Sequence, residues 1–105
     1  MIVVVGRVRT DADRRAELVR VGQTVAQASR EEAGCIAYGL HQDTEDENAF
    51  VFVEEWASGA ALQAHFATAH IAAFMQAIPA TLVAPPVVGF HTIERTRDLS
   101  EVAER

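Results

Sequence analysis

The sequence predicts an α+β domain of ferredoxin-like type, a split βαβ in which helices cover one face of a four-stranded antiparallel sheet. Three observations support this prediction. Four short runs are rich in β-branched or aromatic residues, helix-like segments separate them in the order β-α-β-β-α-β, and no repeat or linker interrupts the 105 residues. We therefore expect one domain over residues 1–105.

The first strand is predicted over residues 2–8, IVVVGRV, which are apolar on both faces and therefore need cover on both. From Asp11 the apolar spacing changes to three or four residues, as in an amphipathic helix of about five turns that ends at Gly34. Its buried face would contain Leu18, Val21 and Val25.

A strand hairpin follows. Residues 35–43, CIAYGLHQD, alternate as a second strand, and the acidic run DTEDEN forms its turn. Residues 49–56, AFVFVEEW, are the third strand, and a period of two places four side chains on one face: Phe50, Phe52, Glu54 and Trp56.

Two short helices and a last strand complete the domain. Ser58 can cap a helix through His65, and Thr68 can cap a second piece that ends before Pro79. Residues 87–95, VVGFHTIER, are the fourth strand.

The face of the sheet away from the helices is expected to be bare and apolar, with side chains from IVVV, FVFV and PVVGF. Soluble monomers rarely expose so large a patch, so we expect a second copy to cover it, as a homodimer with a twofold interface and a dimeric α/β barrel. The tail at 96–105 could dock as a short helix or fray. His41 and His91 lie on strands two and four and could face each other, although exposed or interface positions fit them better.

Composition excludes several classes of function. The formal charge is -6 and the basic residues are scattered, which argues against nucleic acid as a partner. Cys35 is the single cysteine, so an internal disulfide framework is excluded and a reducing cytoplasm fits best. The apolar start MIVVV is too short for a signal peptide or a spanning helix, so no membrane is expected.

A pocket for a flat aromatic molecule is expected between the sheet and the two short helices. The predicted substrate-binding side chains are Trp56, Phe52, Tyr38, Phe66 and Phe74. A carboxylate at Glu54 would be costly among them unless it were paired, so we expect a histidine or Arg7 as its partner in a supporting role. For Trp56 a position in the core fits better than stacking on a ring, and Tyr38 could equally be a core residue.

His65 and His70 are the candidate catalytic residues. They are five positions apart, about 140° around an ideal helix, so on a continuous helix they would not bind a metal together, and no metal is expected. A helix break near Thr68 would let both rings face one cavity. We then expect His70 to be the base and His65 to orient it, and the alternative is that both are structural.

Three motifs give the chain its family resemblance: EEAGCIAY, then E-x-W-x-S from Glu54, then L-x-A-H-x2-T-x-H-x3-F from Leu62. Through them the chain resembles the antibiotic biosynthesis monooxygenase superfamily, in particular its small quinol-monooxygenase-like members. The resemblance implies a dimeric α+β barrel with a pocket in each protomer. It also implies oxidation of quinols or polycyclic phenols by O2 without flavin, haem or metal.

The function predicted from the sequence is a cofactor-independent monooxygenase that oxidises a quinol or related phenol with O2. Two alternatives stay open at this stage. One is a non-catalytic module, for binding an aromatic metabolite or for stress response, and the other is a small-molecule isomerase that uses the same pocket.

Overall fold

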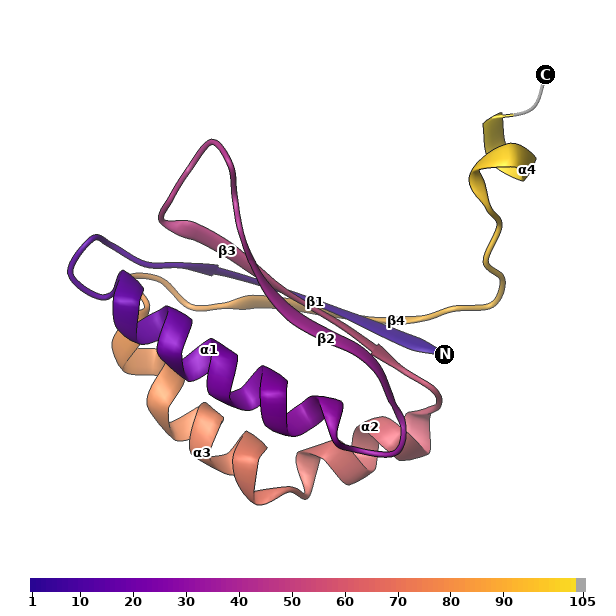
Figure 1. Ribbon diagram of the computed structural model, residues 1–105, viewed down its shortest axis with the longest axis horizontal. Helices are drawn as coiled ribbons and strands as arrows, with labels where there is room; N and C mark the ends of the chain where they lie inside the picture. The colour runs from indigo at the N-terminus through magenta and orange to yellow at the C-terminus, as the bar shows by residue number, and fades with distance from the viewer. Residues whose placement is uncertain (104–105) are drawn as a thin grey trace.

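The computed structural model describes residues 1–103 and has the predicted order of elements (Figure 1). The strands are β1 (Ile2–Arg9), β2 (Cys35–Gln42), β3 (Ala49–Trp56) and β4 (Val87–Thr92). The helices are α1 (Arg15–Arg30), α2 (Gly59–Phe66), α3 (Ala69–Ala77) and α4 (Leu99–Ala103), with a 3-10 turn, η1, at Ile78–Thr81.

The strands form one antiparallel sheet in the order β2-β3-β1-β4, with α1, α2 and α3 on the same side of it (Figure 1). This arrangement confirms the predicted ferredoxin-like α+β fold. Because β2 and β4 are the two outer strands, His41 and His91 lie at opposite edges of the sheet. They do not face each other within the protomer, and both side chains are exposed.

The core lies between α1 and the sheet. Leu18 and Val25 of α1 are almost completely buried, and alternate residues of β3 point at them, as the period of two predicts. The buried residues of β3 are the predicted four, Phe50, Phe52, Glu54 and Trp56. One carboxylate is therefore part of an otherwise apolar row.

Several element boundaries differ from the predictions. The α1 helix begins at Arg15 rather than near Asp11, because the Asp11 carboxylate accepts hydrogen bonds from the backbone N–H groups of Asp13 and Arg14 and forms a turn. It ends at Arg30, before Gly34. The chain stays helical through Pro79 as η1, and β4 ends at Thr92.

The predicted helix break is present. The Ser58 hydroxyl accepts from Ala61 N–H at 3.1 Å and caps α2, and the Thr68 hydroxyl accepts from Ile71 N–H at 3.3 Å and caps α3. Thr68 also donates its hydroxyl hydrogen to the His65 carbonyl at 2.7 Å. One threonine thus ends the first helix and starts the second.

The other face of the sheet has no helix over it (Figure 1). Cross-strand pairs place Val5 beside Val53 and Arg7 beside Val51 on this open face. The tail forms the short helix α4, which projects away from the body with Leu99 and Val102 exposed, and positions 104–105 of the predicted tail lie outside the described residues (Figure 1). In residues 1–103, no helix combines the length and the hydropathy that crossing a bilayer requires.

Candidate functional site

A cavity of about 300 Å³ lies between the sheet and the α2–α3 pair. Its walls are largely apolar and include the edge-to-face pair Phe52 and Phe74, whose ring centroids are 5.3 Å apart. Three polar side chains, Tyr38, Glu54 and His65, lie together in the wall. A pocket of this size with a few converging polar groups is typical of small-molecule sites.

Apolar side chains that are partly exposed to solvent border the mouth of the cavity. Phe66 from α2, Met75 from α3, and Val88 and Phe90 from β4 line the cavity and are each about half exposed. Phe66 and Phe90 approach each other across the opening, with centroids 6.2 Å apart. An entering ring would therefore meet aromatic and thioether surface first.

Behind the cavity, one carboxylate oxygen binds two imidazoles. Glu32 Oε2 lies 2.7 Å from His65 Nδ1 and 2.7 Å from His70 Nε2. An ionised carboxylate only accepts hydrogen bonds, so both nitrogens must carry a hydrogen. In its neutral form His65 then has its lone pair on Nε2, a nitrogen with no hydrogen bond to the described residues.

The turn after α1 brings Glu32 to the histidines. Glu32 N–H donates to the Ser29 carbonyl at 3.0 Å, and Cys35 N–H donates back to the Glu32 carbonyl at 3.0 Å. Gly34 allows this turn to touch α2, because a Cβ built at Gly34 would lie 2.2 Å from the Ala61 Cβ. Glu32 lies within the motif EEAGCIAY, where no sequence pattern indicates a role for it.

Burial controls the ionisation of Glu54. Removal from water raises the pKa of the Glu54 carboxyl, and hydrogen bonds from the Trp56 indole and the Tyr38 hydroxyl, together with nearby His65, partly offset this effect. The Trp56 Nε1–H donates to Glu54 Oε1 at 2.9 Å. Burial and the adjacent Glu54 carboxylate also raise the pKa of Tyr38, so its phenol stays protonated at neutral pH.

The predicted site residues divide between the cavity and its support. Phe52, Tyr38, Phe66 and Phe74 line the cavity, as predicted for substrate contacts. Trp56 does not: it is fully buried behind His65, with ring centroids 4.4 Å apart, and it supports that imidazole. Trp56 therefore occupies the core position that the sequence offered as the alternative to substrate contact.

His70 and Arg7 also lie outside the cavity. The His70 ring faces a shallow depression between α1 and α3, and its Nε2 is held by Glu32. Arg7 pairs in register with Val51, whereas Glu54 pairs with Val4, so Arg7 projects from the opposite face of the sheet. Of the two expected partners of Glu54, Arg7 is therefore excluded by the register, whereas His65 is nearby, and Trp56 and Tyr38 donate hydrogen bonds to Glu54.

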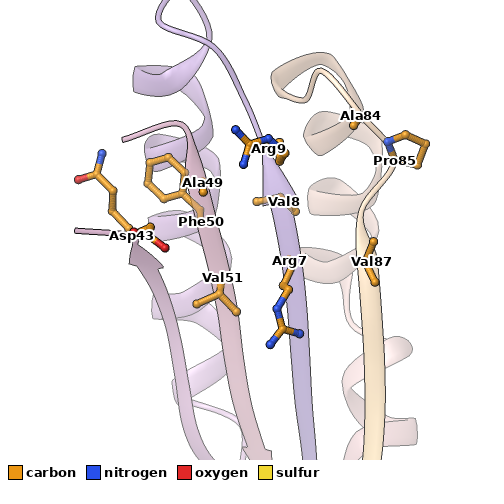
Figure 2. A pocket seen from close by; sticks show the side chains of 11 residues that line it. Arg7, Val8, Arg9, Asp43, Ala49, Phe50, Val51, Ala84, Pro85 and Val87 are labelled. Carbon is orange, nitrogen blue, oxygen red and sulfur yellow. The ribbon is translucent and has the colours of Figure 1, made fainter. Parts of the chain in front are cut away.

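A larger hollow, of about 500 Å³, lies around the ends of β1, β3 and β4 (Figure 2). Arg7, Arg9 and Asp43 surround it together with Val51 and Val87 (Figure 2). It contains no imidazole, and Arg9 is already paired with Asp46 at 2.9 Å. The smaller cavity has the groups that proton chemistry needs, so we take it as the candidate site.

The ligand atoms of Glu32, His65 and His70 lie within 4.8 Å of one another. Carboxylate and imidazole are ligand types that divalent transition metals accept. Among residues 1–103, this trio is the grouping of three or more such side chains close enough to share an ion.

Comparisons with known proteins give a consistent result. The sequence model of a family described as antibiotic biosynthesis monooxygenase matches residues 1–77. An uncharacterised protein of Synechocystis sp. is 35% identical over 98 residues, which are 93% of this chain and 67% of that protein. "Putative monooxygenase YcnE" of Bacillus subtilis is 34% identical over 85 residues, 81% of this chain and 90% of YcnE.

Among solved structures, one from Caulobacter crescentus bears the words antibiotic biosynthesis monooxygenase in its description, preceded by "putative". It is 27% identical, superposes with a TM-score of 0.81 and covers 89% of this chain and 90% of its own.

Proposed function

We propose, from the premise that this chain belongs to the antibiotic biosynthesis monooxygenase family, that it oxidises a quinol or related phenol with O2 and without a cofactor. The observation that carries the proposal is the His65 imidazole at the wall of an apolar cavity, with its Nδ1 held from behind by Glu32 at 2.7 Å. A phenol needs such a base before it can react with O2.

The cavity supports a flat, largely apolar substrate. Phe52 and Phe74, which pack edge to face, give the wall aromatic surface, and about 300 Å³ is at the lower end of the range for small-molecule pockets. Tyr38 and Glu54 add polar contacts beside His65 for a second oxygen of a quinol. We therefore favour a substrate of one or two fused rings over a larger polycycle.

In this proposal His65 is the base, which exchanges the roles predicted from the sequence. His65 lines the cavity and is 1% exposed, whereas His70 faces away from it. His65 Nε2 takes the phenolic proton, and the imidazolium that forms is stabilised by Glu32 at 2.7 Å. Positioned proton transfer of this kind contributes about 10²- to 10⁴-fold in rate.

His70 and Trp56 act through His65. His70 Nε2 is also hydrogen-bonded to Glu32 Oε2, which fixes the position of the carboxylate. Trp56 packs on the His65 ring. Together they give the His65 imidazole one orientation. The phenolate then gives its electrons to O2. For a quinol, one oxygen atom of O2 enters a ring carbon, the other leaves as water, and the product is a hydroxyquinone.

The proposal is tested by oxygen uptake with a panel of benzohydroquinones and naphthohydroquinones. We expect uptake above the rate in buffer, a fall of at least 10²-fold in kcat for His65→Gln, and a smaller fall for Glu32→Gln. Gln27→Asn is the control, because Gln27 is exposed on α1, away from both the cavity and the open face of the sheet. Its kcat should equal that of the wild type.

Other outcomes would separate the alternatives. Thermal stabilisation by a quinol with uptake no faster than in buffer would refute the oxidase proposal and favour a binding module. Turnover that continues without oxygen would favour an isomerase. Equal kcat in His65→Gln and wild type would remove His65 as the base.

We also propose that the protein is a homodimer that uses the open face of its sheet. Val3, Val5, Val51 and Val53 lie there without cover in the protomer, and Arg7 has no hydrogen bond or ion pair among the described residues. Val53→Lys should therefore give monomers in sedimentation velocity, whereas Gln27→Lys, exposed on α1, should not. A wild-type monomer at micromolar concentration would contradict the proposal.

A further inference from the structure

We propose that Glu32, His65 and His70 form a binding site for a divalent transition-metal ion of the zinc class. Glu32 Oε2, His65 Nδ1 and His70 Nε2 converge to within 4.8 Å, and the two oxygen-to-nitrogen distances are both 2.7 Å. Two imidazoles and a carboxylate are a common ligand set for zinc and for non-haem iron.

A continuous helix would keep His65 and His70 from sharing a metal ion. Five positions on such a helix separate two side chains by about 140°. Here α2 ends at Phe66 and α3 begins at Ala69, so the chain changes direction between the histidines. The two rings come within 5.8 Å of each other between centroids, and the geometric objection no longer applies.

The site needs a small adjustment to admit an ion. Ligand bonds of about 2.0–2.1 Å at tetrahedral angles separate ligand atoms by roughly 3.3 Å. The two nitrogens, up to 4.8 Å apart, must approach each other, whereas Glu32 Oε2 is closer to both than the tetrahedral separation and must withdraw by about half an ångström. Its side chain is in a turn and is 15% exposed, which leaves it room to do so.

Metal binding changes the tautomer of each neutral imidazole without removing a proton from it. Coordination at His65 Nδ1 requires its hydrogen to move to Nε2, and coordination at His70 Nε2 requires the hydrogen there to move to Nδ1. With both imidazoles neutral, the trio carries one negative charge from Glu32. A dication therefore meets a site of opposite charge.

The ion would enter from the His70 side. The His70 side chain is 24% exposed and that of His65 is 1% exposed, so the accessible route lies beside α1 and α3, away from the apolar cavity. Three protein ligands leave a fourth tetrahedral position for water. The metal site and the cavity thus lie on opposite sides of the His65 ring.

Metal binding has a consequence for the proposed catalysis, and this part rests on the proposed function. An ion on Nδ1 leaves His65 with a hydrogen on Nε2, where the base needs a lone pair. Zn²⁺ should therefore inhibit oxygen uptake. Binding itself does not depend on turnover.

The experiment is a Co²⁺ titration of the full-length protein after chelation and desalting. The reference protein carries His41→Asn and His91→Asn, which leave His65 and His70 as its imidazoles, since the sequence has four histidines. We expect visible absorption bands that saturate at one Co²⁺ per chain and disappear when Zn²⁺ is added.

Glu32→Gln and His70→Asn in this background should each weaken Co²⁺ binding at least tenfold, and circular dichroism checks their fold. No visible band in the reference protein would overturn the proposal, whether or not those variants fold. Unchanged affinity in both folded variants would overturn it as well. If binding holds but no quinol is oxidised, the metal site stands and the proposed function alone fails.

Discussion

Replacement of Gly34 by Ala tests the contact that brings the Glu32 turn against α2. The new Cβ would lie 2.2 Å from the Ala61 Cβ and 3.3 Å from its Cα, against an ordinary contact of 3.4 Å or more. The turn and the helix must therefore separate by about 1.2 Å, the difference between 3.4 and 2.2 Å. Overpacking of this kind costs roughly 1–3 kcal/mol.

A second effect of Gly34→Ala acts in the opposite direction, so the sign of the change in stability shows which effect is larger. Gly34 does not have positive φ, so alanine fits its backbone and would stabilise the protein by about 0.4–1 kcal/mol through the unfolded chain if the contact were absent. The net expectation is a loss of roughly 1–2 kcal/mol. For a domain of this size that is a fall in Tm of about 4–16 °C, measured by calorimetry or circular dichroism.

Two further variants isolate the contact. Ala61→Gly removes the Cβ that Gly34→Ala would strike, so in that background Gly34→Ala should leave Tm unchanged or raise it. Gly59→Ala is the control, because a Cβ at Gly59 meets nothing within 4 Å, and it should be neutral or stabilising. A rise in Tm for Gly34→Ala in the wild type would contradict a clash with Ala61. An equal fall in Tm in the wild type and in the Ala61→Gly background would contradict it as well.

Three other predictions concern the buried Glu54 and Trp56 pair and the Cys35 thiol. Glu54→Gln keeps a hydrogen-bond acceptor for Trp56 but removes the charge. Because burial raises the pKa of Glu54, the stability of the wild type falls as pH rises above the unfolded pKa of about 4.5. In urea unfolding the variant should lack that fall and be more stable than the wild type at pH 7. Trp56→Phe removes the indole donor and should cost about 1–3 kcal/mol in the same assay, and an unchanged midpoint would show that Glu54 does not need it. Burial, reinforced by Glu32, raises the pKa of the Cys35 thiol, so iodoacetamide should alkylate native Cys35 more slowly than the unfolded chain at pH 8, and equal rates would contradict this.

The fold could be predicted because its strands and helices follow from local sequence patterns. The alternation in β3 identified its buried face without error, and Ser58 and Thr68 marked two helix starts through hydroxyl caps. The start of α1 differed because a side chain competes with the helix for backbone hydrogen bonds, as Asp11 does before Arg15. Such competition depends on geometry that residue types do not fix.

The site was predicted in part. His65, Phe52 and Phe74 were placed in the cavity because they are close in sequence to the strand and helix that form it. The Arg7 prediction failed because the face on which a residue of β1 lies relative to β3 depends on strand register. Glu32 received no role because its contact with His65 spans 33 residues, and it depends on the close approach at Gly34.

One wall of the cavity is formed by β4, an edge strand of the sheet. β4 has six residues, bonds to β1 alone at the edge of the sheet, and contributes Val88 and Phe90 to the cavity. Amide protons at such an edge exchange with solvent through local opening, which takes less free energy than global unfolding. A ring bound between β4 and α3 would slow that exchange, so isotope labelling of β4 amides should report occupancy even for a ligand that is never converted.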